Sequence, residues 1–394
     1  MRADPAASGT LFARIVRDKK IRSILIQLAI AAALVMALVW LGQNTRTNLA
    51  TRGITTGFEF LQRAARFPIA QSVLSYSPTD TFAWACLVGL GNTLSLSVLI
   101  GATSTVLGLM VAVGRRSRHP LAAGLATIFV ETLRNTPLVV QLLFWYALVT
   151  VGLPHSSSAL EPLPGVFLTD RGLFFPAVRT SGDTTIFNAT VLAGLAAVIL
   201  AGIHDRRQRW QGGPRSRRMF IVLLAATALS AFVWWIGDFG VTLQRPRLQR
   251  FNFAGGHVLT PEFVAIFVGL VLYSSAFAGE IIRGGIEAIG IGQWEAARAV
   301  GLSERQTLRL VILPQALRVI IPPMTSQYIT IIRNTTLAVV VGYPDIAVVI
   351  STMINQTGQA VEGILILAAV FVTISTAGSL LMNWYNRRIA LVQR

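Results

Sequence analysis

Long apolar stretches recur along this chain, and they constrain its fold more than any other feature. Eight windows of about 20 residues contain few charges, and they lie at 23–41, 87–113, 122–149, 186–204, 219–237, 261–282, 319–342 and 363–384. A helix of this length and composition crosses the hydrocarbon core of a bilayer. With 53% hydrophobic and only 13% charged residues, the chain is predicted to be an all-α polytopic membrane protein with about eight transmembrane helices.

The distribution of basic residues sets the predicted orientation. If the N-terminus is cytoplasmic, 23 of the 34 basic residues fall on the cytoplasmic side and 9 on the opposite side, while Arg134 and Arg333 lie within windows. Cytoplasmic loops carry an excess of lysine and arginine, so we expect both termini in the cytoplasm. The net charge of +17 then indicates topology and attraction to anionic lipid rather than a nucleic-acid surface.

The first window follows a basic segment that contains Arg14, Arg17, Lys19, Lys20 and Arg22. A basic segment before an apolar run is also typical of a cleavable signal peptide. The run at 23–41 is longer than the apolar region of a typical signal peptide, and the residues after it lack a clear small-x-small cleavage site. The segment is therefore predicted to be a retained signal anchor.

Residue counts exclude several chemistries. Cys86 is the only cysteine, so the chain forms no intrachain disulfide and no cysteine metal cluster, and its four histidines lack metal-ligand spacing. The only lysines are Lys19 and Lys20, and no Gly-Lys-Ser/Thr occurs, so a phosphate-binding P-loop is absent. We expect no catalytic residue, cofactor or metal in this chain.

A polar segment at 283–318 lies between two windows and has the features of a docking element. Residues 293–300 are predicted to form a short helix, and Gly301 stands where a left-handed residue ends such a helix. Ser303, with Gln306 three residues later, is a candidate capping box for a second helix. Short, stiff helices with a polar face suit a contact with a soluble partner.

The residue spacing within this segment is distinctive. Three residues separate Glu295-Ala296-Ala297 from Gly301, and nine residues separate Gly301 from Val311-Ile312-Leu313-Pro314. The pattern resembles the EAA loop of bacterial ABC importer permeases, with Val311 in place of an isoleucine. The resemblance implies docking to a cytoplasmic ABC ATPase dimer, which binds the ATP and Mg. The residues implied to couple the two are Glu295, Ala296, Ala297, Gly301, Leu313 and Pro314.

The flanking residues resemble the polar amino acid branch of these permeases. The similarity includes 131–141 and 277–297, and it covers most of 87–149 and 260–388, about half of the chain. It implies a type I ABC importer transmembrane fold, in which the second, third, sixth, seventh and eighth windows form a five-helix core and three spans are additional. The length of the chain and the segment 51–58 are similar to the long permease subunits for general L-amino acids or for glutamate, glutamine, aspartate and asparagine.

The same resemblance implies an organisation and a set of partners. The N-terminal tail, first span and an outward loop occupy 1–86, the core occupies 87–149 and 261–394, and 150–260 inserts a second outward loop and two extra spans. The implied partners in the bacterial inner membrane are a second homologous permease, a periplasmic amino-acid-binding protein, an L-amino acid and membrane lipid. Each outward loop is interpreted either as a lid or partner surface, or as a linker packed on the membrane.

Charges inside the windows indicate a polar solute. Glu131 and Arg134 are three residues apart on one helical face, and Glu280 and Arg283 repeat this spacing. An ionisable residue at membrane depth costs about 3 kcal/mol, so it should face protein or a water-filled path. Arg134 and Arg333 are candidates for binding a substrate carboxylate. Their polar neighbours are Asn135, Thr136, Gln141, Asn334 and Thr335. The alternative is that these charges only pair with each other and pin helices together.

The predicted function is that of a transmembrane permease subunit of an ABC importer for L-amino acids, without an ATPase site of its own. An ion-gradient-driven secondary amino acid carrier is the alternative, because it also needs buried charge pairs. The inverted repeats of many carriers are not evident. A membrane-embedded enzyme is a third hypothesis, but no His-Asp, Ser-x-x-Lys or metal-binding arrangement is evident.

Overall fold

The computed structural model describes residues 19–51, 57–180, 185–210, 218–237, 240–250 and 252–389. Arg14 and Arg17 of the basic N-terminal segment lie outside these ranges, as do residues 52–56 of the segment compared above with the long permease subunits. The chain divides into two compact units. Unit 1 consists of residues 1–99, 289–339 and 344–394, and unit 2 consists of residues 100–288 and 340–343.

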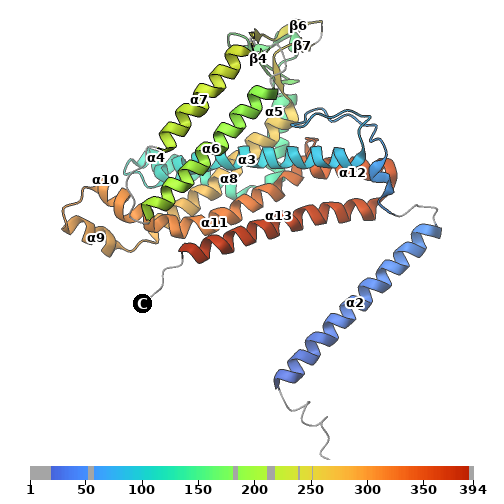
Figure 1. Cartoon of the computed structure of the whole chain (residues 1–394), viewed down its shortest axis with the longest axis horizontal. Helices are drawn as coiled ribbons and strands as arrows, with labels where there is room; N and C mark the ends of the chain where they lie inside the picture. Colours follow the sequence, from blue (N-terminus) through green and yellow to red (C-terminus); the bar gives the residue numbers. More distant parts are fainter. Residues whose placement is uncertain are drawn as a thin grey trace, which may run out of the picture. The chain divides into compact units, whose positions relative to one another are not determined.

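Helices form most of the described chain (Figure 1). Seven of the described helical segments are long and apolar enough to cross a membrane, and each overlaps one of the predicted windows. The helices in these segments are α2 (Lys19–Thr51), α3 (Phe82–Arg115), α6 (Thr185–Trp210), α7 (Arg218–Ile236), α8 (Pro261–Glu287), α11 (Leu313–Asn334) and α13 (Ala360–Ile389). The prediction of a helical, polytopic membrane protein is therefore confirmed.

The remaining window, at 122–149, contains two helices instead of one continuous span. They are α4 (Pro120–Asn135) and α5 (Leu138–Thr150). Pro137 has no N–H to donate, and its ring disfavours a helical conformation of the residue before it. Thr136 accordingly has an extended backbone, with φ −95° and ψ 129°. Neither piece alone has the length of a membrane span, so the continuous span predicted for this window is replaced by two shorter helices.

Residues 57–81 of unit 1 fold into a packed cap. The segment includes a short 3-10 helix, η1 (Glu59–Gln62). Phe60 and Phe67 are buried together with Phe82 at the start of α3 and with apolar residues of α12 (Ile346–Thr357). Residues 57–81, from the first predicted loop, are thus folded onto helices of their own unit.

Asn92, which is fully buried in α3, fastens this cap by three hydrogen bonds. Its Nδ2 donates to the carbonyl oxygens of Gln71 (2.9 Å) and Pro344 (2.8 Å), and its Oδ1 accepts from the backbone N–H of Val73 (3.0 Å). Asp345 follows directly and caps the N-terminus of α12 with Oδ1. A single amide side chain therefore links the cap, α3 and the turn that precedes α12.

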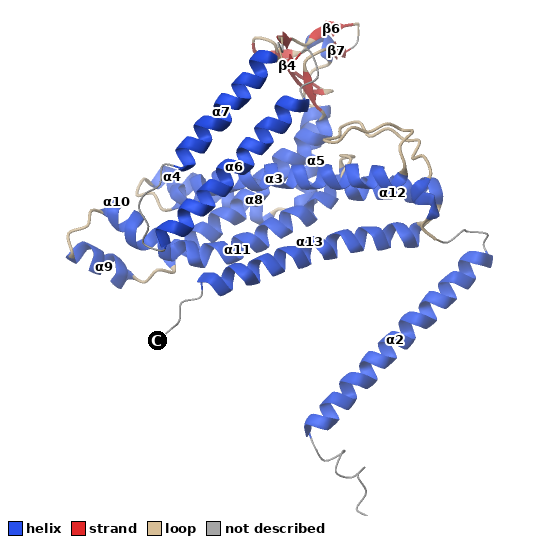
Figure 2. Ribbon diagram, in the orientation of Figure 1, coloured by secondary structure: helices blue, strands red, loops and turns tan. Residues whose placement is uncertain are grey.

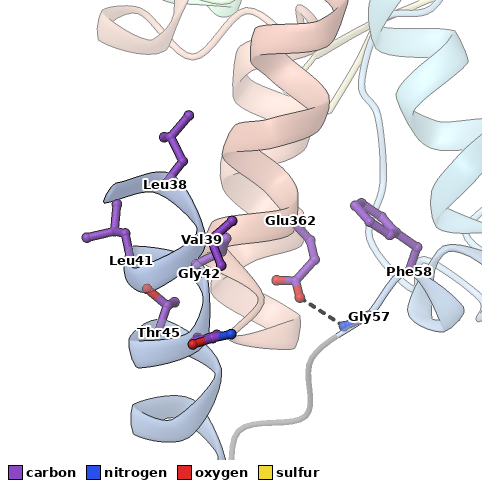
Figure 3. Close-up of a pocket in the computed structure, with 10 residues that line it drawn as sticks. Leu38, Val39, Leu41, Gly42, Thr45, Gly57, Phe58 and Glu362 are labelled. Atoms are coloured by element: carbon purple, nitrogen blue, oxygen red, sulfur yellow. Dashed lines mark hydrogen bonds between the residues drawn. The ribbon is translucent and has the colours of Figure 1, made fainter. Parts of the chain in front are cut away.

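The beginning of the cap is also attached to α13. Glu362, which is buried in the first turn of α13, accepts a hydrogen bond of 2.9 Å from the backbone N–H of Gly57 (Figure 3). An open cleft of about 670 Å³ lies beside this contact and is lined by Phe58 and by α2 residues that include Leu38 and Thr45.

The insertion at 150–260 in unit 2 contains short strands as well as the two extra helices (Figure 2). One antiparallel sheet has the order β1-β2-β3-β8, and β4-β5 and β6-β7 form two further pairs. β4 leads into α6 and β5 follows α7, so their pairing closes the base of a helical hairpin. The bounds are η2 (Ser156–Ser158), β1 (Leu160–Leu163), β2 (Val166–Thr169), β3 (Gly172–Phe175), β4 (Ala177–Thr180), β5 (Val241–Gln244), β6 (Arg247–Gln249), β7 (Asn252–Ala254) and β8 (His257–Leu259).

Candidate functional site

The short helix expected in the docking segment is α9 (Ile291–Ala299). Gly301 follows it with φ +81°, the left-handed conformation expected at this position. The N–H of Gly301 donates to the carbonyl oxygen of Arg298 (2.9 Å), and the N–H of Leu302 donates to that of Ala297 (3.1 Å). These bonds satisfy carbonyl groups that the end of a helix would leave free, so α9 ends sharply.

The capping box expected after α9 is present. Ser303 Oγ accepts from the N–H of Gln306 (3.4 Å), and Gln306 Oε1 accepts from the N–H of Ser303 (2.9 Å). The helix that starts here differs from the expected separate second helix. α10 (Glu304–Gln306) has one turn, passes into the π-helical segment η3 (Thr307–Ile312), and continues directly into α11. The second half of the docking segment is therefore the beginning of a membrane span.

α9 packs against η3 and leaves most of its predicted coupling residues exposed. Ala297 is only 5% exposed, and Ile312 of η3 is fully buried. Gln315 Nε2 of α11 donates to Gln293 Oε1 of α9 at 3.2 Å. The exposed coupling residues are Glu295, Ala296, Gly301, Leu313 and Pro314. Of the six predicted coupling residues, Ala297 is thus buried within the docking segment, and the other five are exposed and accessible to a partner.

Four of the candidate pathway residues surround the break between α4 and α5. Arg134 and Asn135 are exposed in the last turn of α4, and Thr136 ends the helix. Gln141 of α5 is only 5% exposed, and its Nε2 donates to the carbonyl oxygens of Leu133 (2.8 Å) and Thr136 (2.9 Å). Gln141 therefore pairs with carbonyl groups that the interrupted helix leaves without a helical partner.

A cluster of charged residues in unit 2 centres on Glu280 of α8. Both oxygens of this carboxylate are used: Oε1 pairs with Arg115 of α3, and Arg283 donates to both oxygens at 3.1 and 3.0 Å. Arg134 of α4 lies 3.8 Å from Oε2, and its guanidinium group lies over the Phe277 ring, 5.1 Å from the centroid. The Glu280 side chain is 18% exposed, whereas that of Arg134 is 39% exposed. One carboxylate thus joins α3, α4 and α8.

The observed pairing differs in part from the spacing argument. Glu280 and Arg283 are paired, but Arg134 reaches Glu280, while the exposed Glu131 accepts a hydrogen bond of 3.3 Å from Asn135 Nδ2. Arg115 was missed as a member of the cluster, because a basic residue at a span end is a common topology signal.

The sequence Arg-Asn-Thr occurs at 134–136 and again at 333–335, and the second occurrence lies at the end of α11 in unit 1. Arg333 is exposed and donates to Ser375 Oγ of α13 at 2.7 Å. Asn334 is the last α-helical residue, and the chain continues as the 3-10 helix η4 (Thr335–Val340). Thr335 is fully buried, with its hydroxyl donating to the carbonyl oxygen of Ile332 at 2.8 Å. The two similar segments therefore each mark the end of an α-helix within a predicted span.

Comparisons with known proteins agree with these features. Residues 104–391 match the family described as binding-protein-dependent transport system inner membrane component. The putative amino-acid ABC transporter permease protein YhdX of Escherichia coli K12 is 43% identical over 95% of each chain. The general L-amino acid transport system permease protein AapQ of Rhizobium johnstonii is 38% identical over 98% of this chain and 97% of its own. The glutamate/glutamine/aspartate/asparagine transport system permease protein BztB of Rhodobacter capsulatus is 33% identical over 100% and 99%.

Among solved structures, one described as an amino acid ABC transporter with histidines matches 78% of this chain and 95% of its own, with 21% identity and a TM-score of 0.48. The membrane-length helices, the family match and the three relatives define a multi-pass membrane transport subunit. The chain belongs to the family of inner membrane components of binding-protein-dependent transport systems. The secondary-carrier alternative has no support among these matches.

Proposed function

We propose that the chain is the permease subunit of an ATP-driven importer for L-amino acids and that α9 is its contact helix for a separate ATPase. The geometry of the docking segment carries this proposal. α9 ends at the left-handed Gly301, is anchored through the buried Ala297, and presents Glu295 outward. Because α10, η3 and α11 are continuous, a displacement of the docking segment is transmitted directly to the membrane span that contains α11. The names of the three relatives support an amino acid as the solute.

The partners follow from the same proposal. A cytoplasmic ABC ATPase dimer binds ATP and Mg, a periplasmic binding protein delivers the amino acid, and a second homologous permease completes the pathway. The protein lies in the bacterial inner membrane with both termini in the cytoplasm. The excess of basic residues on the side of the docking segment supports this orientation.

Arg134 is the proposed contact for the substrate carboxylate. It is the most exposed of the three arginines around Glu280, and at 3.8 Å it lies beyond hydrogen-bonding distance of that carboxylate. Its guanidinium donors therefore remain available for a second carboxylate in a bidentate arrangement. Arg333, with Asn334 and Thr335, is the second candidate, because its observed partner, Ser375, is uncharged.

Reconstitution distinguishes the importer from a carrier. The chain is inserted into proteoliposomes with its ATPase and permease partners, and uptake of radiolabelled amino acids is followed with ATP inside, binding protein outside, or both. Uptake should require both and should persist when ionophores collapse proton and sodium gradients. Uptake driven by such a gradient in the absence of the ATPase would refute the proposal.

Arg134→Ala tests the substrate contact. Loss of one charge-assisted hydrogen-bonding group costs about 1.5–3 kcal/mol, so the amino acid concentration that half-saturates ATPase stimulation should rise roughly 10- to 100-fold. Arg134→Lys keeps the charge but not the fork, and its effect should be smaller. The subunits should still co-purify, since the proposed role of Arg134 is to contact substrate. Loss of assembly would instead show that Arg134 pins helices together.

A further inference from the structure

An apolar groove runs between the end of α3 and the start of α4 in unit 2. It is an open depression with a volume of about 520 Å³. Its lining residues are Leu109, Met110, Val113, Gly114, Ser117 and Ala122. A side chain added at Gly114 would meet the Ala126 Cβ at 3.2 Å, so the two helices are in close contact at this residue. Met110 and Val113 are 65% and 63% exposed, so both remain open to the surroundings at the groove.

One end of the groove lies where α3 and α8 end. Arg115 at the end of α3 pairs with Glu280, and Arg116 lies 3.9 Å from Glu287 at the end of α8. The docking segment follows the end of α8 along the chain. If that segment contacts a cytoplasmic ATPase, as proposed above, the groove opens to the cytoplasmic leaflet.

Basic residues are concentrated at the same end of the groove. The turn between α3 and α4 contains Arg116, Arg118 and His119, all of them exposed, and Ser117 of this turn also lines the groove. Arg116 of this turn lies close to Glu287, whose side chain is 46% exposed. The turn therefore places exposed basic residues immediately beside the apolar groove.

We propose that this groove binds one anionic glycerophospholipid of the cytoplasmic leaflet. The phosphate and the anionic headgroup lie against Arg116 and Arg118, and an acyl chain follows the groove past Val113 and Met110. An anionic lipid fits this surface because basic residues at one end of the groove can contact its headgroup. The apolar lining next to them can contact its acyl chain. Basic pockets between spans on the cytoplasmic side are typical sites for such headgroups.

Photolabelling of the assembled transporter tests the proposal. The complex is placed in nanodiscs that contain phosphatidylglycerol with a diazirine in one acyl chain, or the corresponding phosphatidylcholine, and labelled peptides are mapped by mass spectrometry. Residues 109–122 should be labelled preferentially by the phosphatidylglycerol. In the double variant Arg116→Gln/Arg118→Gln this labelling should fall roughly 30-fold, about 5-fold for each basic residue lost. Met110→Trp should block the groove and abolish the label.

Two controls match these changes. Arg318→Gln removes an exposed arginine of α11 that is not part of the groove, and Val106→Trp adds the same bulk to an exposed position of α3 outside the lining. Both should retain wild-type labelling. Equal labelling by the two lipids, or retained labelling in Met110→Trp, would overturn the proposal. So would labelling of the isolated chain but not of the complex, because another subunit would then cover the groove. The labelled mass is independent of uptake, so this test fails separately from that of the proposed importer function.

Discussion

Replacing Glu280 with glutamine is expected to weaken the contact among α3, α4 and α8. Glu280 is shared by Arg115, Arg134 and Arg283, and its side chain and that of Arg115 are 18% and 16% exposed. Removing one partner of a buried ion pair costs about 3–5 kcal/mol, because the remaining charge is left without compensation. The residual exposure of the arginines screens part of this cost, so we expect a loss of roughly 2–3 kcal/mol. Glutamine has nearly the same volume as glutamate, so the loss of stability reports the removal of the charge and not a change in packing.

Glu287→Gln is the matched control. Glu287 lies on the same helix and also pairs with Arg283, but its side chain is 46% exposed, so its loss should cost no more than about 1 kcal/mol. The midpoint of thermal unfolding in nanodiscs, followed by tryptophan fluorescence, compares the two variants. Raising the salt concentration should reduce the difference between wild type and Glu287→Gln more than that for Glu280→Gln. Equal effects of the two substitutions, or no effect at Glu280, would refute the view that the largely buried carboxylate of Glu280 holds three helices together.

Substitutions at three further positions test other parts of the molecule. Burial raises the pKa of Asp345 to about 7, so between about pH 4 and 7 the folded state holds a proton that the unfolded chain has lost. The thermal midpoint should therefore fall as the pH rises from about 4 to 7, and Asp345→Asn, which retains the N-cap, should abolish this slope. Gly301→Ala should cost about 1–2 kcal/mol for its left-handed backbone and reduce co-purification of the ATPase, whereas Gly301→Asn should retain more of it. Gln141→Leu leaves two carbonyl groups without a side-chain donor and should lower the free energy of unfolding by about 1–3 kcal/mol, measured as a lower midpoint of thermal unfolding.

The docking segment was largely predictable because its structure depends on residues close in sequence. A left-handed residue after a short helix requires Gly301 or a similar residue, and the reciprocal capping box needs only Ser303 and Gln306. Both features are present in the structure. The continuity of η3 with α11 was not predictable in this way, since π-helical hydrogen bonding has no local sequence signature comparable to a cap.

The charge cluster shows the limit of spacing arguments. A separation of three residues correctly pairs Glu280 with Arg283, because both lie on one helix. The same separation suggests Glu131 for Arg134, but Arg134 lies closer to the more buried carboxylate of a neighbouring helix, Glu280. Which helices are neighbours depends on tertiary packing, and a single sequence contains no direct information about that.

The strands of the insertion were missed for a different reason. Each has three or four residues, which is too short for an alternation of apolar and polar residues to stand out. Their pairing is also partly long-range, since β3 pairs with β8 and β4 with β5 across the α6–α7 hairpin. Strands joined across two membrane-length helices give no hairpin signal in the sequence.

Two helix ends lie within predicted spans, at residues of the proposed solute pathway. An interrupted helix leaves carbonyl groups unpaired, and the bilayer core tolerates such backbone only where protein or a water-filled cavity surrounds it. At the end of α4, Gln141 supplies donors for two of these carbonyls, and at the end of α11 the chain tightens into a 3-10 helix. The negative end of a helix dipole also favours a cation there, and both ends contain an arginine, Arg134 and Arg333. Helix ends and charged side chains thus occur together within two predicted spans, which is the combination that the proposed passage of a polar solute requires, and Arg134→Ala decides between this role and the pinning of helices.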